Sequence, residues 1–259
     1  RGLGDVYKRQ ALGVIRLVLE NELRFSLNHI TSFCFGAMFA AKAEPAIADG
    51  APDVPSDSEG VTNVEDLPET VMDLGKALGA LGDAANDLES FFHDRLKVFL
   101  RDKGVPHDII DACLAMPNAD DLTLLVKRAE ALAAFMQTED GENLTQGFKR
   151  AHNILRQAEE ADGVEYSYGP DPKLAETDEE KALFAALDAA EAKIAPAMDA
   201  EDFSTAMAAM ATLRAPIDSF FEAVQVNAEN QVLRRNRLNL LHRISQICLS
   251  VADLTQVEG

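Results

Sequence analysis

The sequence predicts an almost all-α protein, and three observations support this prediction. Of the 259 residues, 47% are hydrophobic, and Ala and Leu recur in long stretches where Gly and Pro are sparse. Aromatic residues make up only 6% of the chain, and Trp is absent. Apolar residues recur at helical spacing, whereas no segment shows the alternating pattern of a half-buried β-strand. A chain of this length and composition can bury at least one full core.

The apolar pattern of the N-terminal part predicts that it contains the last helices of an earlier domain. Residues 11–27 have apolar side chains at helical spacing, and a second apolar stretch runs over residues 30–39. The spacing in the first stretch is set by Leu12, Ile15, Leu19 and Leu23. Residues 1–10, RGLGDVYKRQ, do not fit the expected helix and resemble translated sequencing-adaptor sequence. We therefore expect residues 1–10 to be non-native.

A linker is expected after these helices. Residues 44–68 contain four prolines and many acidic side chains, a composition typical of a surface loop between domains. The sequence therefore predicts four segments in order. They are foreign sequence (residues 1–10), a domain end (11–43), the acidic linker (44–85) and a helical domain (86–259).

Local signals mark several helix ends within residues 86–259. Pro106 is placed to open a short helix, and Asn118 is a candidate N-cap for a core helix that ends near residue 136. Thr177 and Glu180 form the pattern of a capping box, and Pro196 is expected to limit the helix that follows. Further helices are expected over residues 142–160, from Phe203 to Leu213, at Pro216 and after Asn227.

The net charge of −20 does not by itself exclude a polyanionic partner. Residues 40–90 contain 12 acids and 2 bases, and residues 158–202 contain 14 acids and 3 bases. The rest of the chain is therefore close to neutral, and its Arg and Lys residues gather on particular predicted helices. This distribution is compatible with a local phosphate-binding face beside solvated acidic segments.

Several function classes lack support in the sequence. The three cysteines, Cys34, Cys113 and Cys248, are far apart and fit reduced thiols in a cytosol, so we expect a cytoplasmic protein. The longest apolar run is too short to cross a bilayer. We find no zinc-binding spacing, nucleophile elbow or complete phosphate loop, and we therefore expect no catalytic or metal-binding residue in this chain.

Five segments together resemble one family. ALGVIRLVLEN, residues 11–21, resembles the helix that closes the HD-like domain of bacterial glycyl-tRNA synthetase β subunits. The other segments follow in the family's order, at residues 91–114, 148–155, 171–184 and 213–244. Residues 148–158 and 220–241 also resemble the helical, DALR-like anticodon-binding domain of arginyl-tRNA synthetases. The chain thus looks like a C-terminal fragment of the β subunit, with an anticodon-binding helical bundle after the closing helices of an HD-like domain.

The resemblance implies a partnership and a chemistry. It implies an α2β2 glycine–tRNA ligase that uses ATP and Mg²⁺, with the aminoacylation centre in the α subunit. The expected partners are tRNA-Gly and that α subunit, with neither a membrane nor DNA. No cofactor is expected on this fragment, which would position tRNA-Gly without contributing a catalytic side chain.

The candidate tRNA-binding surface consists of polar residues from the two segments that most resemble the anticodon-binding domain. These residues are Lys149, Arg150, Asn153, Arg156, Arg234, Arg235 and Arg237. Lys and Arg would contact phosphates, while unpaired bases would provide discrimination. Tyr166 and Tyr168 could stack on bases, although pinning of their own loop is the favoured interpretation.

Two other interpretations of the same residues stay open. The cations could balance acidic neighbours on a non-enzymatic helical scaffold or adaptor. Alternatively, the helical domain could belong to another synthetase, such as an arginyl-tRNA synthetase. The HD-like segment before residue 30 and the segment 171–184 argue against that second alternative.

Overall fold

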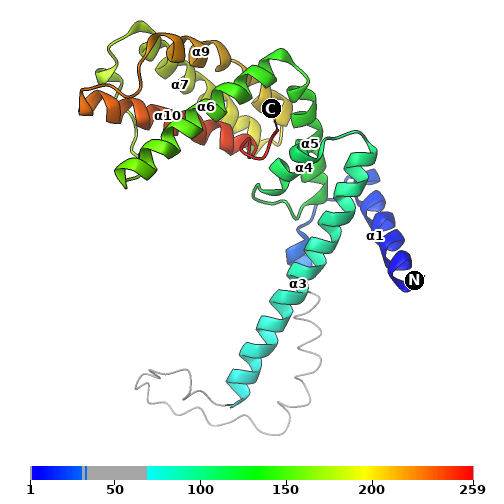
Figure 1. The fold of residues 1–259 in the computed structure, drawn as a ribbon. Helices are drawn as coiled ribbons and strands as arrows, with labels where there is room; N and C mark the ends of the chain where they lie inside the picture. Colours follow the sequence, from blue (N-terminus) through cyan, green and yellow to red (C-terminus); the bar gives the residue numbers. More distant parts are fainter. Residues whose placement is uncertain (1, 31–32, 34–68, 259) are drawn as a thin grey trace. The chain divides into compact units, whose positions relative to one another are not determined.

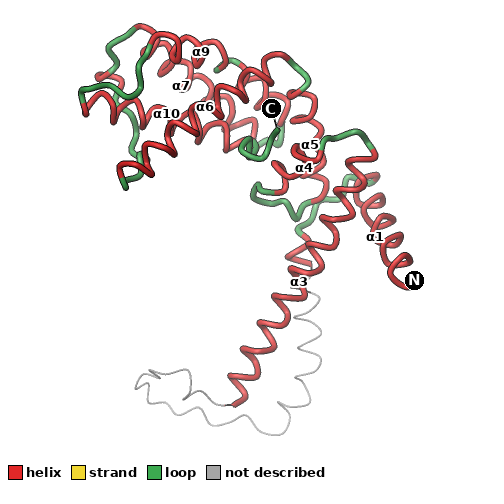
Figure 2. Tube along the Cα trace, viewed as in Figure 1, coloured by secondary structure: helices red, strands yellow, loops and turns green. Residues whose placement is uncertain are grey.

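The computed structural model describes residues 2–30, 33 and 69–258. Within these ranges every regular element is helical and none is a strand, which confirms the all-α prediction (Figure 2). The chain divides into two compact units. The first contains residues 1–98 and 120–122, and the second contains residues 99–119 and 123–259.

Helix α1 (Gly2–Glu20) in the first unit is amphipathic. It includes residues 2–10, so the expectation that residues 1–10 do not fit the helix is wrong for these residues, while their foreign origin stays a prediction. Ala11, Ile15 and Val18 are buried at helical spacing, as expected for one apolar face. The helix ends earlier than the predicted residue 27, because Glu22 takes a left-handed backbone conformation with φ 48°. After this turn, the Arg24 guanidinium lies 2.7 Å from the Asp121 carboxylate and ties the segment to residues 120–122.

Helix α3 (Glu69–Asp102) is the longest helix described, with 34 residues. It includes residues 69–85, which were assigned to the acidic linker, while residues 44–68 of that linker lie outside the described residues. The second apolar stretch, residues 30–39, also lies almost entirely outside them. The division into a foreign segment, a domain end, a linker and a helical domain stays a prediction.

The second unit is a helical bundle (Figure 1). Its helices are α4 (His107–Leu114), most of α5 (Leu122–Met136), α6 (Glu139–Asp162), α7 (Asp178–Asp199), α8 (Phe203–Ala211), α9 (Arg214–Ala223) and α10 (Gln231–Val251). Helix α10 packs against α6, α7 and α8, and α9 packs against α6 and α7. The core between them includes Phe148, Leu187, Phe220 and Leu241, all essentially inaccessible to solvent.

Local signals predicted some helix ends correctly and others wrongly. The capping box at Thr177 is formed, since its hydroxyl accepts from the Glu180 N–H while the Glu180 carboxylate accepts from the Thr177 N–H. The helix nevertheless passes through Pro196 to Asp199, because a proline in the last turn removes only one bond from the end of the ladder. Asn118 is not an N-cap: it lies in a turn with φ 61°, and α5 begins at Leu122.

Candidate functional site

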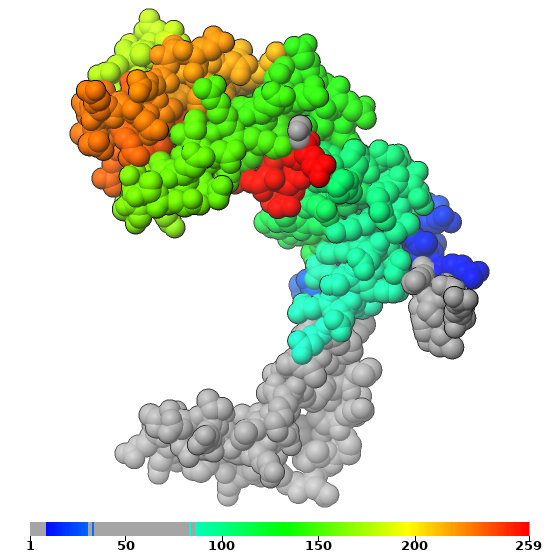
Figure 3. Space-filling model, in the orientation of Figure 1, coloured from blue at the N-terminus to red at the C-terminus, as the bar shows by residue number. Residues whose placement is uncertain are grey.

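Helices α6 and α10 bring the two predicted basic segments into one unit. The two helices pack against each other, and Figure 3 shows atoms of α6 in green beside atoms of the first part of α10 in orange. The packing follows from apolar faces, with Phe148 and Leu155 buried on α6 and Leu241 buried on α10. The outer face of α6 is thereby left polar, whereas α10 also buries polar side chains, among them Asn236, Arg237 and Asn239.

The first half of the predicted surface lies on the outer face of α6. Arg150 and Asn153 are exposed, and Lys149 is half-buried. The Arg150 guanidinium lies 4.4 Å from the centre of the Phe221 ring, a cation–π contact that links α6 to α9 and keeps the charge at the surface. Neither Lys149 nor Arg150 forms an ion pair with any described residue, so both charges are available to an anion.

Arg156 is also exposed, but its charge is partly offset. Its guanidinium lies 3.0 Å from the carboxylate of Glu160 one turn further along α6. An exposed pair of this kind contributes only about 0–1 kcal/mol, because water and salt screen it. A phosphate can therefore compete for Arg156 at little cost.

Arg237 does not belong to an exposed surface, and its prediction as a tRNA-binding residue needs correction. Its side chain is buried between α10 and α7, where Nε donates to the Glu180 carboxylate at 2.7 Å. One terminal nitrogen also donates to the carbonyl of Gln225 at 3.1 Å. Burial of the unpaired carboxylate of the capping box would be costly, so Arg237 is held as its counter-ion.

Arg234 fixes the connecting loop, defined as residues 163–171 between α6 and the short 3-10 helix η2 (Pro172–Leu174). Its guanidinium donates to Asp162 at 2.7 Å and to the Tyr166 hydroxyl at 3.1 Å. The Tyr166 hydroxyl in turn donates to Asp162 at 2.6 Å. The hydrogen bonds from Tyr166 and Arg234 lower the pKa of Asp162, which keeps this carboxylate charged. Arg234 is thus half-buried and engaged within the fold.

The two tyrosines of the connecting loop have different environments. Tyr166 is buried and pinned, which agrees with the favoured interpretation of its role. Tyr168 is 68% exposed, and its ring lies 5.8 Å from the guanidinium of the exposed Arg235. An exposed cation–π pair is worth about 0.5–1 kcal/mol, so both flat groups can move to accept a partner.

Asn236 anchors the far end of the connecting loop. Its carbonyl oxygen accepts from the Asp171 N–H at 2.7 Å, and its amide nitrogen donates to the Asp171 carbonyl at 3.1 Å. Asn236 was not among the predicted residues. The sequence signal was an amide on the side of α10 that also contains Leu240 and Leu241, where a polar group needs a partner.

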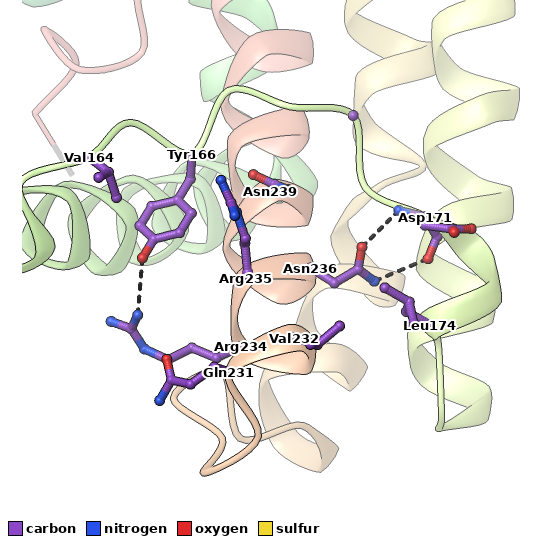
Figure 4. Close-up of a pocket in the computed structure, with 11 residues that line it drawn as sticks. Val164, Tyr166, Asp171, Leu174, Gln231, Val232, Arg234, Arg235, Asn236 and Asn239 are labelled. Atoms are coloured by element: carbon purple, nitrogen blue, oxygen red, sulfur yellow. Dashed lines mark hydrogen bonds between the residues drawn. The ribbon is translucent and has the colours of Figure 1, made fainter.

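A groove of about 600 Å³ lies between the connecting loop and the first turns of α10 (Figure 4). Arg235, Asn236 and Asn239 face it from α10, while Tyr166 and Asp171 face it from the loop side. The groove thus combines one exposed guanidinium with amides and apolar surface, a lining that suits a flat, polar-edged ligand.

Two features are absent from the described residues: a metal-binding cluster and a membrane-spanning helix. Within the described ranges, no group of three or more His, Cys, Asp or Glu residues is placed to hold a metal ion. Among the helices described, none is both long enough and apolar enough to cross a membrane.

Two family models and several curated proteins match this chain. Residues 6–115 match the family model described as glycyl-tRNA synthetase beta subunit, and residues 144–258 match the DALR anticodon binding domain. A glycine–tRNA ligase beta subunit of Dinoroseobacter shibae is 61% identical over 257 residues, covering 97% of this chain and 34% of the relative. A second, of Cereibacter sphaeroides strain ATCC 17023, is 57% identical and covers 97% of this chain and 31% of the relative. The chain therefore spans about a third of the length of the curated relatives it matches.

Proposed function

Since this chain belongs to the glycyl-tRNA synthetase β-subunit family, we propose that its second unit holds tRNA-Gly for aminoacylation. The observation that supports the proposal most directly is the match of residues 144–258 to a DALR anticodon binding domain. This range contains α6 from residue 144 onward, the connecting loop and α10, and with them every exposed cation of the candidate surface.

In this proposal, charge and shape contribute to tRNA binding in different ways. Exposed cations attract and orient the phosphate backbone without regard to sequence, and unpaired bases give discrimination when they reach aromatic and polar side chains. Lys149, Arg150, Arg156 and Arg235 supply the charges on this surface. Arg234 and Arg237 support it from within, by holding the connecting loop and the contact between α7 and α10.

The proposal assigns the chemistry of the ligase to another subunit. ATP and Mg²⁺ would be used at an active site in the α subunit of an α2β2 enzyme, and this chain would contribute by holding the tRNA in place. Its location would be the cytoplasm, where tRNA is charged. No side chain of this chain is assigned a catalytic role.

The test is tRNA binding by the 259-residue chain across a salt series, with tRNA-Ala as competitor. Affinity for tRNA-Gly should fall as salt rises, because phosphate contacts release counterions. Arg150→Ala, Arg156→Ala and Arg235→Ala should each weaken binding and reduce the salt slope by about 1. Lys181→Ala is the matched control, since it removes an exposed cation from α7, outside the candidate surface.

A scaffold or adaptor role predicts a different outcome. The wild-type chain would then show no salt-sensitive affinity for tRNA, and the α6 and α10 variants would behave like Lys181→Ala. That result would remove the tRNA-holding proposal and leave protein carboxylates as the natural partners of the exposed cations.

A further inference from the structure

Asn239 on α10 is a buried amide whose oxygen has no hydrogen-bond partner among the described residues. The residue is 7% exposed, and its Oδ1 atom is closed off from solvent. A buried acceptor without a donor costs free energy, and most such groups in folded proteins are satisfied. The position therefore calls for an explanation that packing alone does not provide.

Anchoring of the connecting loop does not provide that explanation. Asn236, one turn earlier on α10, already uses both its amide oxygen and its amide nitrogen to hold Asp171. Figure 4 shows these two bonds and shows the amide of Asn239 apart from them. The two amides thus differ in role: one is consumed by the fold, and the other retains an unused acceptor.

Asn239 lines two hollows. One is the groove, and the other is a second hollow of about 390 Å³ that residues 167–170 of the connecting loop also line. Arg235 lines the first hollow and Tyr168 the second. The guanidinium and the ring contact each other at 5.8 Å, so this exposed pair connects the linings of the two hollows.

We propose that this place receives one unstacked nucleobase of the bound tRNA and that Asn239 reads its edge. The inference rests on the proposed function. Tyr168 and Arg235 would move to admit the base, which would then stack against the ring of Tyr168 and the plane of Arg235. A base N–H would donate to Asn239 Oδ1, which this movement would expose. Single-stranded bases are recognised in this way, by a flat partner for the face and polar atoms for the edge. Asn239 is then a specificity-determining residue, and Tyr168 is a stacking platform.

The experiment compares affinities of the 259-residue chain for tRNA-Gly and for transcripts with single changes at each unpaired base of the anticodon loop. The wild-type chain should discriminate by at least about tenfold at one position, the size expected of a good polar contact to a base edge. Asn239→Ala should lose discrimination at that position alone, with an unchanged salt slope. Asn143→Ala, the same change on α6 outside the groove, should keep it.

A second variant keeps the test independent of folding, because Tyr168 is 68% exposed. Tyr168→Ala should weaken binding of tRNA-Gly by about 5- to 100-fold, while Tyr168→Phe retains the ring and should bind like the wild type. Circular dichroism of Asn239→Ala shows whether its helical content is preserved. If it is not preserved, the comparison of Tyr168→Ala with Tyr168→Phe decides the outcome.

The possible failures are distinguishable. Suppose that the wild-type chain binds tRNA in a salt-sensitive way. If Asn239→Ala then keeps full discrimination, or Tyr168→Ala keeps full affinity, this inference is overturned and the proposed function still stands. If the wild-type chain binds tRNA without preferring any base, this inference is likewise overturned and the proposed function still stands. Absence of salt-sensitive binding by the wild type would overturn both.

Discussion

Arg237 on α10 and Glu180 on α7 form an ion pair inside the bundle, with Nε 2.7 Å from Oε1. Both residues are buried, at 7% and 1% exposure, and Glu180 also closes the capping box at the start of α7. The pair joins two helices that are distant in sequence, and it explains why a cation of the predicted surface lies in the interior.

Arg237→Ala should therefore destabilise the fold by about 3–5 kcal/mol, because it leaves the Glu180 carboxylate buried without its counter-ion. Arg156→Ala is the control: its pair with Glu160 is exposed, and its loss should cost about 0–1 kcal/mol. Urea unfolding followed by circular dichroism measures both. Equal unfolding midpoints for the two variants would show that Arg237 is not the counter-ion we describe.

The Glu180 carboxylate should also make stability depend on pH. Burial raises its pKa, but the hydrogen bonds from Arg237 and from the N–H groups of Thr177 and Glu176 outweigh burial and hold the pKa below its ordinary value of 4.5. A lowered pKa means that the folded state favours the charged form. The resulting stabilisation is present above pH 4.5 and is lost as the pH falls through the folded-state pKa.

Glu180→Gln isolates this contribution, since the amide does not titrate. The stability advantage of the wild type over Glu180→Gln, measured by urea unfolding, should be largest at neutral pH and should shrink as the pH is lowered below 4.5. An advantage that stays constant throughout the acid range would contradict the lowered pKa.

Gly141 in the first turn of α6 should not tolerate a side chain. A Cβ atom there would lie 2.2 Å from the carbonyl oxygen of Phe135, which is backbone and cannot rotate away. Gly141→Ala should therefore lower the free energy of unfolding by about 1–3 kcal/mol. Gly169→Ala adds the same methyl group in open space and should stay within about 0.5 kcal/mol of the wild type. Matching thermal midpoints for the two variants would count against the close contact.

Cys113 and Cys248 should be inert toward thiol reagents in the folded chain. Both are buried and free, and burial raises the pKa of each to about 12. At pH 8 only about one thiol in ten thousand would then be ionised, and the thiolate is the reactive form. Cys34 lies outside the described residues, so the measurement uses Cys34→Ser. Ellman's reagent should detect almost no thiol until urea is added, and rapid reaction of the folded chain would contradict the burial.

The features that were predicted correctly depend on residues that lie close together in the sequence. The capping box at Thr177 was predictable because its two residues lie three positions apart and satisfy each other's backbone groups. The buried face of α6 was predictable because Phe148, Ala151 and Leu155 recur with the helical period. The all-α class followed from the same periodicity repeated along the chain.

The candidate site was harder to predict because its partners are far apart in sequence. Arg237 was assigned to the surface since its neighbours are cations, yet its counter-ion lies 57 positions earlier. Arg234 likewise meets Asp162 across 72 positions. No local pattern reveals such pairs, because they depend on how α10 is rotated against α6 and α7.

The connecting loop is held by hydrogen bonds within the fold, and this has a kinetic consequence. It is fixed at Tyr166 and at Asp171, while Tyr168 between them remains exposed. A partner that meets Tyr168 does not have to freeze a flexible segment, so little conformational entropy is lost on association. Differences in affinity among ligands at this loop should then appear mainly in how long each remains bound.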